Sequence, residues 1–231
     1  AGATSGGAAL VVRPGVTDLK GLKIADPQTG GTQDIALRTY LADKGLEVDK
    51  QGAGDVSILA QENAQTLDLF KAGKVDGAWV PEPWASRLVL DGGGTVLVDE
   101  KALWPSGQFV TTNLLVRKAF LAKHADVVKA LLKAQLAAND EIAADPAKAK
   151  TVINDALKQL TGKSLKPAVI DRAFAQIVLT ADPLAASLKA IAEHAFATGL
   201  VKPGDLKGIY DLAPLEAVTG KHYDDAGLGK G

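Results

Sequence analysis

Residues Leu19–Leu46, LKGLKIADPQTGGTQDIALRTYLADKGL, decide the expected fold because they read as a strand, a glycine loop and a helix. The apolar stretch Leu22–Ala25 predicts a short strand, which a loop with a proline and two glycines ends. The run Gln33–Lys44 is amphipathic at helical spacing, and Gly45 stands at the position where helices commonly terminate. The stretch is therefore typical of a β-loop-α unit.

The start of this helix is a candidate anion site. The first N–H groups of a helix have no partners within it, and the macrodipole places partial positive charge there. Gly30 and Gly31 would let an anion approach the backbone, and Thr32 and Gln33 add side-chain donors. The same residues also fit a purely structural interpretation, with Thr32 as the N-cap and the glycines serving only the turn.

Composition excludes several classes of function. The chain has 231 residues, 47% hydrophobic and 23% charged, with a net charge of −1, as expected for one large or two small globular domains. No basic cluster favours nucleic acid, and no apolar run approaches the roughly 18–20 residues of a membrane span. Cysteine is absent, which excludes thiol catalysis and disulfides. Methionine is absent too, and from this we expect a chain truncated at its N-terminus.

Strands and helices alternate in the first half of the sequence, which favours an α/β layer with a mostly parallel sheet. Helices are expected at 33–44, 64–72 and from about 82 to 90. The expected strands are Ala8–Val12, Leu22–Ala25, Val75–Val80, Thr95–Val98 and Val110–Val116.

The second half is predicted to be helical. Apolar residues recur at helical spacing after residue 125, and Asp145-Pro146 and Asp182-Pro183 each pair a capping residue with proline, a strong helix start. The segment from Asp205 reads as a solvated tail. These helices have apolar stripes but no strands of their own to cover, so we expect that a sheet preceding residue 1 would complete their layer.

Catalytic and metal-binding patterns are missing from the sequence. His124, His194 and His222 are far apart and lack neighbours at metal-ligand spacing, so each is interpreted as an ordinary surface or helix-end residue. No nucleophile, base and oxyanion site can be assembled. The sequence therefore predicts no enzyme, no cofactor and no metal.

A second candidate segment is VDGAWVPEPWASRLVL, residues Val75–Leu90. Glu82 and Trp84 follow a strand that is expected to be buried, at the edge where open α/β sheets bind ligands. Packing of the tryptophans in the core and a first-turn role for Glu82 explain the segment equally well. Two interpretations are also open for Gln108, Thr111 and Thr112. Either these polar residues face a cleft, or they belong to an ordinary strand that enters the sheet.

Three segments together resemble the substrate-binding proteins of nitrate/sulfonate/taurine ABC importers, and among these the aliphatic sulfonate-binding type. They are GGAALVVRPGVTDLKGLKIADPQTGGTQDIALRTYL at 6–41, KVDGAWVPEPWASRL at 74–88 and FVTTNLLVRKAFL at 109–121. The resemblance implies a periplasmic-binding-protein-like two-lobe fold (type II), with two hinge crossings and closure on a small oxyanion. It extends over essentially the whole chain.

The resemblance also implies a division of the chain. Residues 1–12 would be a hinge strand entering from the first lobe, with the crossing at Ala8–Val12. Residues 13–117 would form a complete α/β lobe, with the second crossing near Leu115–Lys118. Residues 118–231 would be the helical C-terminal part of the first lobe plus the tail. The N-terminal part of that lobe is expected to be missing from this chain, so the chain alone is expected to bind ligand weakly.

By this resemblance the ligand-binding residues are Gly30, Gly31, Thr32 and Gln33, together with Glu82 and Trp84 near the hinge and Ser5 and Gly6 at the hinge entry. The implied function is extracytoplasmic capture of an alkanesulfonate for an ABC permease, by a monomer, periplasmic or lipid-anchored at the cell surface. Nitrate, taurine or another small oxyanion is the alternative ligand. A thiamin-pyrimidine-synthase-like enzyme, the alternative of another class, would need a reactive histidine and a cysteine-rich loop that the sequence does not show.

Overall fold

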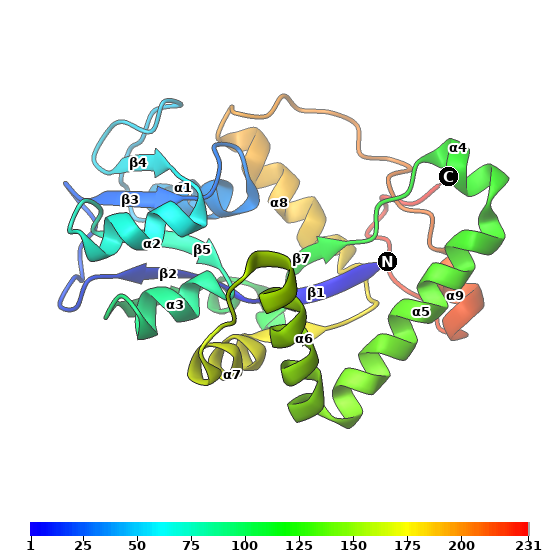
Figure 1. Ribbon diagram of the computed structural model, residues 1–231. Coiled ribbons are helices and arrows are strands. Elements are labelled where there is room, and N and C mark those ends of the chain that lie inside the picture. The colour runs from blue at the N-terminus through cyan, green and yellow to red at the C-terminus, as the bar shows by residue number, and fades with distance from the viewer. Residues whose placement is uncertain (231) are drawn as a thin grey trace.

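A five-stranded sheet organises the first half of the chain in the computed structural model, which describes residues 1–230 (Figure 1). Its order is β4-β3-β5-β2-β6. The strands are β2 (Ala8–Val12), β3 (Lys23–Asp26), β4 (Ser57–Ala60), β5 (Gly77–Pro81) and β6 (Thr95–Asp99). With the helices on both of its faces, this sheet confirms the expected α/β class.

The sheet is mixed, so the expectation of a mostly parallel sheet is only partly confirmed. β3 runs parallel to β4 and to β5, as the alternation of strands and helices predicts. β2 instead runs antiparallel to both of its neighbours, β5 and β6. The physical reason is its origin, because β2 enters this sheet directly from a strand of another sheet instead of from a crossover helix.

Helices cover both faces of the five-stranded sheet. α1 (Thr32–Asp43) packs on one face, and α2 (Asn63–Lys71) and α3 (Trp84–Leu90) pack on the other. All five residues of β2 are buried because each face of the sheet has its own core. The α1 side contains Leu10, Ile24, Leu37, Leu41 and Trp79, and the opposite side contains Val11, Phe70, Ala78, Val80 and Leu88.

A second, three-stranded antiparallel sheet has the order β7-β1-β8. It contains β1 (Gly2–Gly6), β7 (Val110–Asn113) and β8 (Ile177–Leu179). β7 is three residues shorter than the strand predicted from the sequence, and β1 and β8 were not predicted. The sequence of β1, GATSG, has Thr4 as its one β-branched residue and no aromatic residue, so its pairing depends mainly on tertiary contacts. The helical half therefore contributes to a sheet within the described residues.

The remaining helices belong to the second half of the chain. They are α4 (Lys118–Lys123), α5 (Ala125–Ala144), α6 (Pro146–Thr161), α7 (Pro167–Gln176), α8 (Ala185–Ala197) and α9 (Ala213–Thr219). Short 3₁₀ turns at Glu100–Leu103 and Pro105–Gly107 connect β6 to β7.

The helix start predicted from Asp145-Pro146 is confirmed at α6, and the start predicted from Asp182-Pro183 is wrong at α8. The Asp145 carboxylate accepts a hydrogen bond from the Lys148 N–H at 2.9 Å, Pro146 opens α6, and Gly162 ends it with a positive φ, all as predicted. At α8 the Asp182 carboxylate bonds the Leu184 N–H instead, and the helix begins after Leu184. Asp182-Pro183 is therefore a turn that precedes the helix by two residues.

The expected apolar stripe of α5 is buried only in part. Val128 and Leu132 pack against Leu215 of α9, whereas Val127 and Leu131 remain exposed. α6 has no buried residue, and Leu160 on it is largely exposed.

The expected solvated tail from Asp205 is wrong. Tyr210, Leu212 and Leu228 are buried in one cluster with Ala185 at the start of α8. Leu215 of α9 is buried against α5. The apolar residues of this segment are too widely spaced to give a clear periodic pattern, which explains why the sequence alone did not indicate its packing.

Sheet membership divides the chain differently from the boundaries expected at 12 and 117. The chain passes from β1 in one sheet to β2 in the other at Gly6 and Gly7, which both have positive φ values, near 76° and 78°. It returns over residues 100–109, between β6 and β7. Ala8–Val12 thus belongs to the five-stranded sheet, and the segment before Leu115 already belongs to the other sheet.

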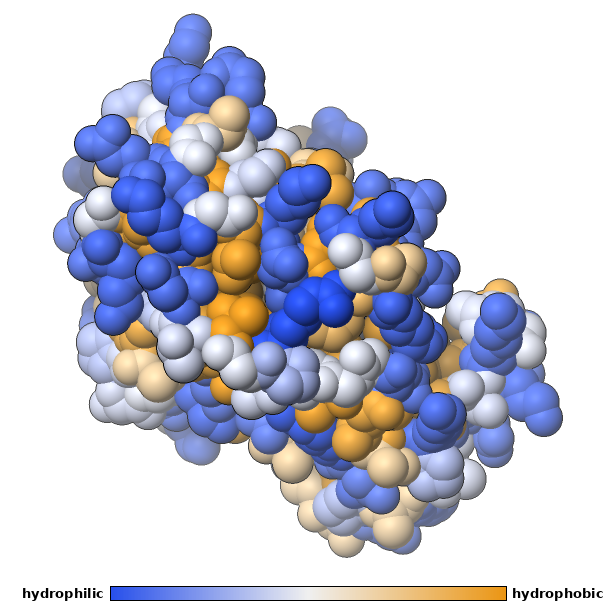
Figure 2. Space-filling view, turned by 90° about the vertical axis from the view of Figure 1, so that its left-hand side faces the viewer, coloured by the Kyte–Doolittle hydropathy of each residue, from blue (hydrophilic) through white to orange (hydrophobic). Residues whose placement is uncertain are grey.

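The outer face of the five-stranded unit is mainly hydrophilic, with apolar patches between the polar side chains (Figure 2). Among the helices of residues 1–230, none combines the length and the hydropathy that crossing a bilayer requires.

Truncating the α1 core should destabilise the protein strongly. Leu37→Ala removes a side chain that is fully buried between α1 and the sheet, so we expect a loss of about 2–5 kcal/mol in the free energy of unfolding. Leu131→Ala, at an exposed leucine of α5, should change it by less than about 1 kcal/mol. Urea unfolding measures both, and equal losses would contradict this assignment of the core.

Candidate anion site at the N-terminus of α1

The N-terminus of α1 has donors without acceptors. Its N-cap is Gly31, in an extended conformation, and glycine has no side chain that could accept from the first turn. Among residues 1–230, no acceptor is bonded to the main-chain N–H groups of Thr32, Gln33 or Asp34. Thr32 is thus the first helical residue, and the alternative interpretation of Thr32 as the N-cap is excluded.

The two glycine N–H groups are used by the loop itself. Gly31 donates to the Gln28 carbonyl at 2.9 Å, and Gly30 donates to Asp34 Oδ2 at 2.7 Å. Gly30 has a φ of 73°, a left-handed conformation that favours glycine. Among the four expected ligand residues of this loop, Gly30 and Gly31 use their amides to hold the loop in shape. The amides of Thr32 and Gln33 are unpaired.

Thr32 and Gln33 line a crevice between α1, α8 and the β6–β7 connection. Its volume is about 10 Å³, close to the space of one water molecule. The lining residues are Thr32, Gln33, Ile35, Ala36, Glu100, Trp104, Phe109, Val110, Thr111, Ile191 and His194.

A larger open hollow of about 1110 Å³ lies along α1 and shares part of this lining. Ala36, Glu100, Trp104 and His194 border both spaces. A hollow of this size accommodates a small molecule. The crevice lined by Thr32 and Gln33 therefore lies next to a hollow large enough for a ligand.

The wall opposite α1 is aromatic and contains one buried carboxyl group. Trp104 stacks on Phe109 with ring centroids 5.5 Å apart, and the His194 ring lies 5.9 Å from Trp104. Glu100 Oε2 accepts a hydrogen bond from the indole of Trp79 at 2.7 Å. Burial raises the pKa of Glu100 to about 7, against the opposing effect of its indole hydrogen bonds.

Glu82 and Trp84 lie outside this crevice. Glu82 Oε1 pairs with Arg172 of α7 at 3.3 Å, and its Oε2 accepts the Ser86 N–H at 3.0 Å. Burial raises the pKa of Glu82 above its usual range. The Trp84 ring lies under the Arg87 guanidinium, 4.6 Å from its centroid, and packs on the α2–α3 side of the sheet. The structure does not bring these two residues together with Thr32.

Ser5 and Gly6 connect the two crossings between the sheets. The buried Ser5 hydroxyl accepts a hydrogen bond from the Phe109 N–H at 3.2 Å, and the Gly6 N–H donates to the Phe109 carbonyl. A Cβ at Gly6 would come within 2.9 Å of the Gln176 carbonyl oxygen. Ser5 and Gly6 themselves do not line the crevice, but they bond Phe109, which does.

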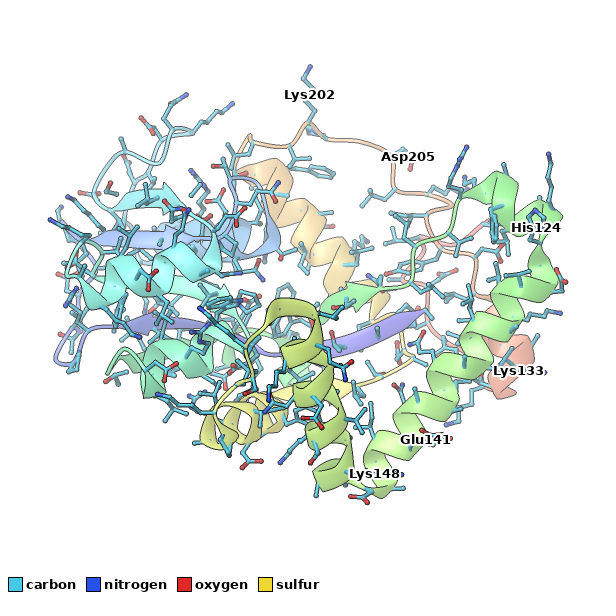
Figure 3. The ribbon with its side chains drawn as sticks, in the orientation of Figure 1. His124, Lys133, Glu141, Lys148, Lys202 and Asp205 are labelled. Atoms are coloured by element: carbon cyan, nitrogen blue, oxygen red, sulfur yellow. The ribbon has the colours of Figure 1, made fainter. Side chains whose placement is uncertain are left out.

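All three histidines were expected to be ordinary surface or helix-end residues, and the structure differs from this expectation at His194. His124 is exposed beside α5, far from α1 (Figure 3), and His222 is exposed in an ion pair with Glu216. His194, in contrast, is half-buried and lines the crevice. Residues 1–230 contain no cluster of three or more acidic or histidine side chains that could hold a metal.

Sequence reasoning missed Glu100, Trp104 and His194 at the crevice. Thr111 was considered, without a decision between cleft and strand, and the structure places it opposite Thr32 and Gln33. One signal was present, because Trp104 stands in a Trp-Pro-Ser-Gly turn between the strands predicted at Thr95–Val98 and Val110–Val116, where a large aromatic residue needs a packing partner. Neither Glu100 nor His194 has a comparable signal.

Comparison with known proteins identifies the family. The model of the NMT1-like family matches residues 4–155, which is more than half of the chain. The chain belongs to the NMT1-like family. The taurine-binding periplasmic protein of Escherichia coli is 31% identical over 141 residues, which are 60% of this chain and 42% of that protein. The nitrate/nitrite binding protein NrtA of Nostoc sp. is 38% identical over 72 residues, 31% of this chain and 16% of that protein. The chain thus spans less than half the length of these relatives of the NMT1-like family.

Solved structures support the fold of this NMT1-like chain. The alkanesulfonate-binding protein SsuA of Xanthomonas axonopodis, bound to MOPS, aligns with a TM-score of 0.65 and 24% identity over 87% of this chain and 69% of that one. The periplasmic nitrate-binding protein NrtA of Synechocystis aligns with a TM-score of 0.57 and 24% identity over 74% and 46%. At these identities the likeness establishes the fold, which is the expected periplasmic-binding-protein type.

The Glu82–Arg172 pair should stabilise the packing of α7 against α3. Arg172→Ala leaves the nearly buried Glu82 carboxylate without its cation, so we expect a loss of about 1–3 kcal/mol in unfolding free energy. Lys129→Ala, at an exposed lysine of α5, is the matched control. Adding Glu82→Gln to Arg172→Ala should recover part of the loss in urea unfolding. An Arg172→Ala protein as stable as the Lys129→Ala control would contradict the pairing.

Proposed function

We propose that this chain acts as an extracytoplasmic solute-binding protein of an ABC importer and captures aliphatic sulfonates without covalent chemistry. The observation that carries the proposal is the set of unpaired amides at Thr32, Gln33 and Asp34, beside a crevice at a glycine-capped helix. Such amides and the helix dipole stabilise a negatively charged group. The taurine-binding, nitrate-binding and sulfonate-binding names of the relatives and structural neighbours support the same class of ligand.

The division into two sheets suggests how capture would occur. We propose that the five-stranded unit and the unit around β7-β1-β8 are the two lobes, with Gly6, Gly7 and residues 100–109 as the crossings. A sulfonate group is larger than the present crevice, so α1 must separate from α8 and Trp104 before it enters. Closing again would remove water around the anion, which strengthens its hydrogen bonds to neutral donors.

Chemical selectivity would follow from the walls of the site. Trp104, Phe109 and Ile191 offer apolar surface beyond the amides, which favours an alkyl chain on the anion over a bare ion. An ABC permease and an extracytoplasmic location follow from the same proposal. Glu82 and Trp84 would contribute to closure through α3 and α7 instead of touching the ligand.

Binding should rank pentanesulfonate above taurine and nitrate. Titrating labelled protein by nuclear magnetic resonance detects millimolar affinities, and thermal shift measures the stabilisation, about 2.7 kcal/mol at 100 times the dissociation constant. The Thr32 and Gln33 amide signals should move most. If the protein binds nitrate and does not respond to sulfonates, the proposed ligand is wrong. If it responds to no oxyanion, the proposed function is wrong.

Removing donors at α1 should weaken sulfonate binding. Thr32→Pro deletes one unpaired N–H at the first helical position, where proline is tolerated, and should lower affinity by about tenfold. Thr32→Ala and Gln33→Ala should each cost about 1–3 kcal/mol of binding free energy, as for hydrogen bonds to a charged group. Lys118→Pro, at the first residue of α4, is the matched control. Unchanged affinity in all three α1 variants would exclude this loop from the site.

A further inference from the structure

A buried group of three charged residues lies directly behind the α1 loop. Asp26 ends β3, and Asp34 and Arg38 lie one turn apart on α1. The side chains of Asp26 and Asp34 are fully buried, and Arg38 is 8% exposed. Two carboxyl groups and one guanidinium are thus buried near one another, and the guanidinium pairs with Asp34.

Asp34 holds the loop and the helix together. Its Oδ1 accepts from Arg38 Nε at 2.6 Å, and its Oδ2 accepts from the Gly30 N–H at 2.7 Å. Arg38 also donates to the Asp49 carbonyl at 2.7 Å. In a capping box the acid at the third helical position bonds the N-cap amide, whereas Asp34 reaches one residue further back, to Gly30. The N-cap, Gly31, has no side chain to accept from the first turn, which leaves the next amides unpaired.

Asp26 has an unsatisfied oxygen. Its Oδ1 accepts the Gln28 N–H at 2.9 Å, but its Oδ2 is buried without a hydrogen-bond donor among residues 1–230. A buried ionised carboxylate without full compensation is costly, and such groups normally take up a proton. A proton on Oδ2 would supply the missing bond, since Asp34 is within hydrogen-bonding reach.

Within residues 1–230, the charged groups that act on Asp26 all come from α1. Its register partner on β4 is Ala60, and on the β5 side the neighbouring pairs contain Ala78 and Gly77. Of the groups acting on it, Asp34 is negative and Arg38 is positive, both from α1. Burial, followed by the charge of Asp34, raises the pKa of Asp26 to about 7.

We propose that Asp26 and Asp34 share one proton beneath the α1 N-terminus and that this pair is the positioning device of the anion site. With the proton present, the two carboxyl groups and Arg38 sum to zero charge, and Asp34 keeps Gly30 in place. Without it, a second negative charge lies behind the unpaired amides, opposes the bound anion and strains the link to Gly30. Anion affinity therefore falls as the pH rises. This inference rests on the proposed function.

The test compares pentanesulfonate affinity at pH 6 and pH 8, because a sulfonate does not titrate in this range. The unmodified protein should bind about tenfold more weakly at pH 8, the effect of one unscreened charge nearby. The Asp26→Asn variant should bind pentanesulfonate at both pH 6 and pH 8 with the affinity that the unmodified protein has at pH 6. Asp18→Asn, at an exposed aspartate, should retain the decrease.

Glu100 requires a separate variant, because it lines the crevice and its pKa is also raised to about 7. The inference is wrong if the decrease in pentanesulfonate affinity between pH 6 and pH 8 is still present in Asp26→Asn but is absent in Glu100→Gln. So would an affinity of the unmodified protein that does not depend on pH.

Protein stability tests the proton without any ligand. The folded pKa of Asp26 lies near 7 and its ordinary value is 3.8, so the folded state binds more protons between these values. Unfolding free energy should therefore decrease as the pH rises from about 4 to 7, and Asp26→Asn should flatten this decrease and be the more stable protein at pH 8. Absence of sulfonate binding at every pH would reject the proposed function, and this profile would still decide whether the proton is present. An identical profile in Asp26→Asn would overturn the shared proton itself.

Discussion

A helix that begins on a glycine is the constraint on which the candidate site depends. At α6, by comparison, the Asp145 carboxylate accepts a hydrogen bond from the Lys148 N–H of the first turn. At α1 the N-cap is Gly31, so three amides are left to solvent or to a ligand. The Gly30 amide is meanwhile bonded to Asp34. Unpaired amides at a helix N-terminus favour a negatively charged group, and this is the basis of the proposed anion site.

Tertiary structure converts this helix end into one side of a crevice. The β6–β7 connection brings Glu100, Trp104 and Phe109 opposite α1, and α8 adds His194. Ser5 and Gly6 hold Phe109 where the chain crosses between the sheets. The first crossing is thus hydrogen-bonded to a residue that lines the crevice. In the proposed closure, movement at Gly6 and Gly7 would shift Phe109 relative to α1.

Agreement between sequence and structure is best where the signals are local. The loop and helix of α1, Gly45 after its end, and the Asp145-Pro146 start of α6 all depend on backbone preferences within one turn. The errors arose where partners are distant in sequence. β1 has no strand signal of its own, β2 is antiparallel because of where it enters, and the C-terminal segment packs through scattered apolar residues. Local propensity cannot predict any of these.

By itself, the sequence determined that this is an α/β chain, that α1 follows a glycine loop, and that the chain resembles oxyanion-binding proteins. These follow from residues adjacent in the chain. Only the tertiary structure decided that Glu82 pairs with Arg172, that Trp84 packs away from α1, and that Asp26 is buried against Asp34. Those outcomes depend on which distant elements meet, and on the low dielectric that burial creates there, which no spacing of residue types contains.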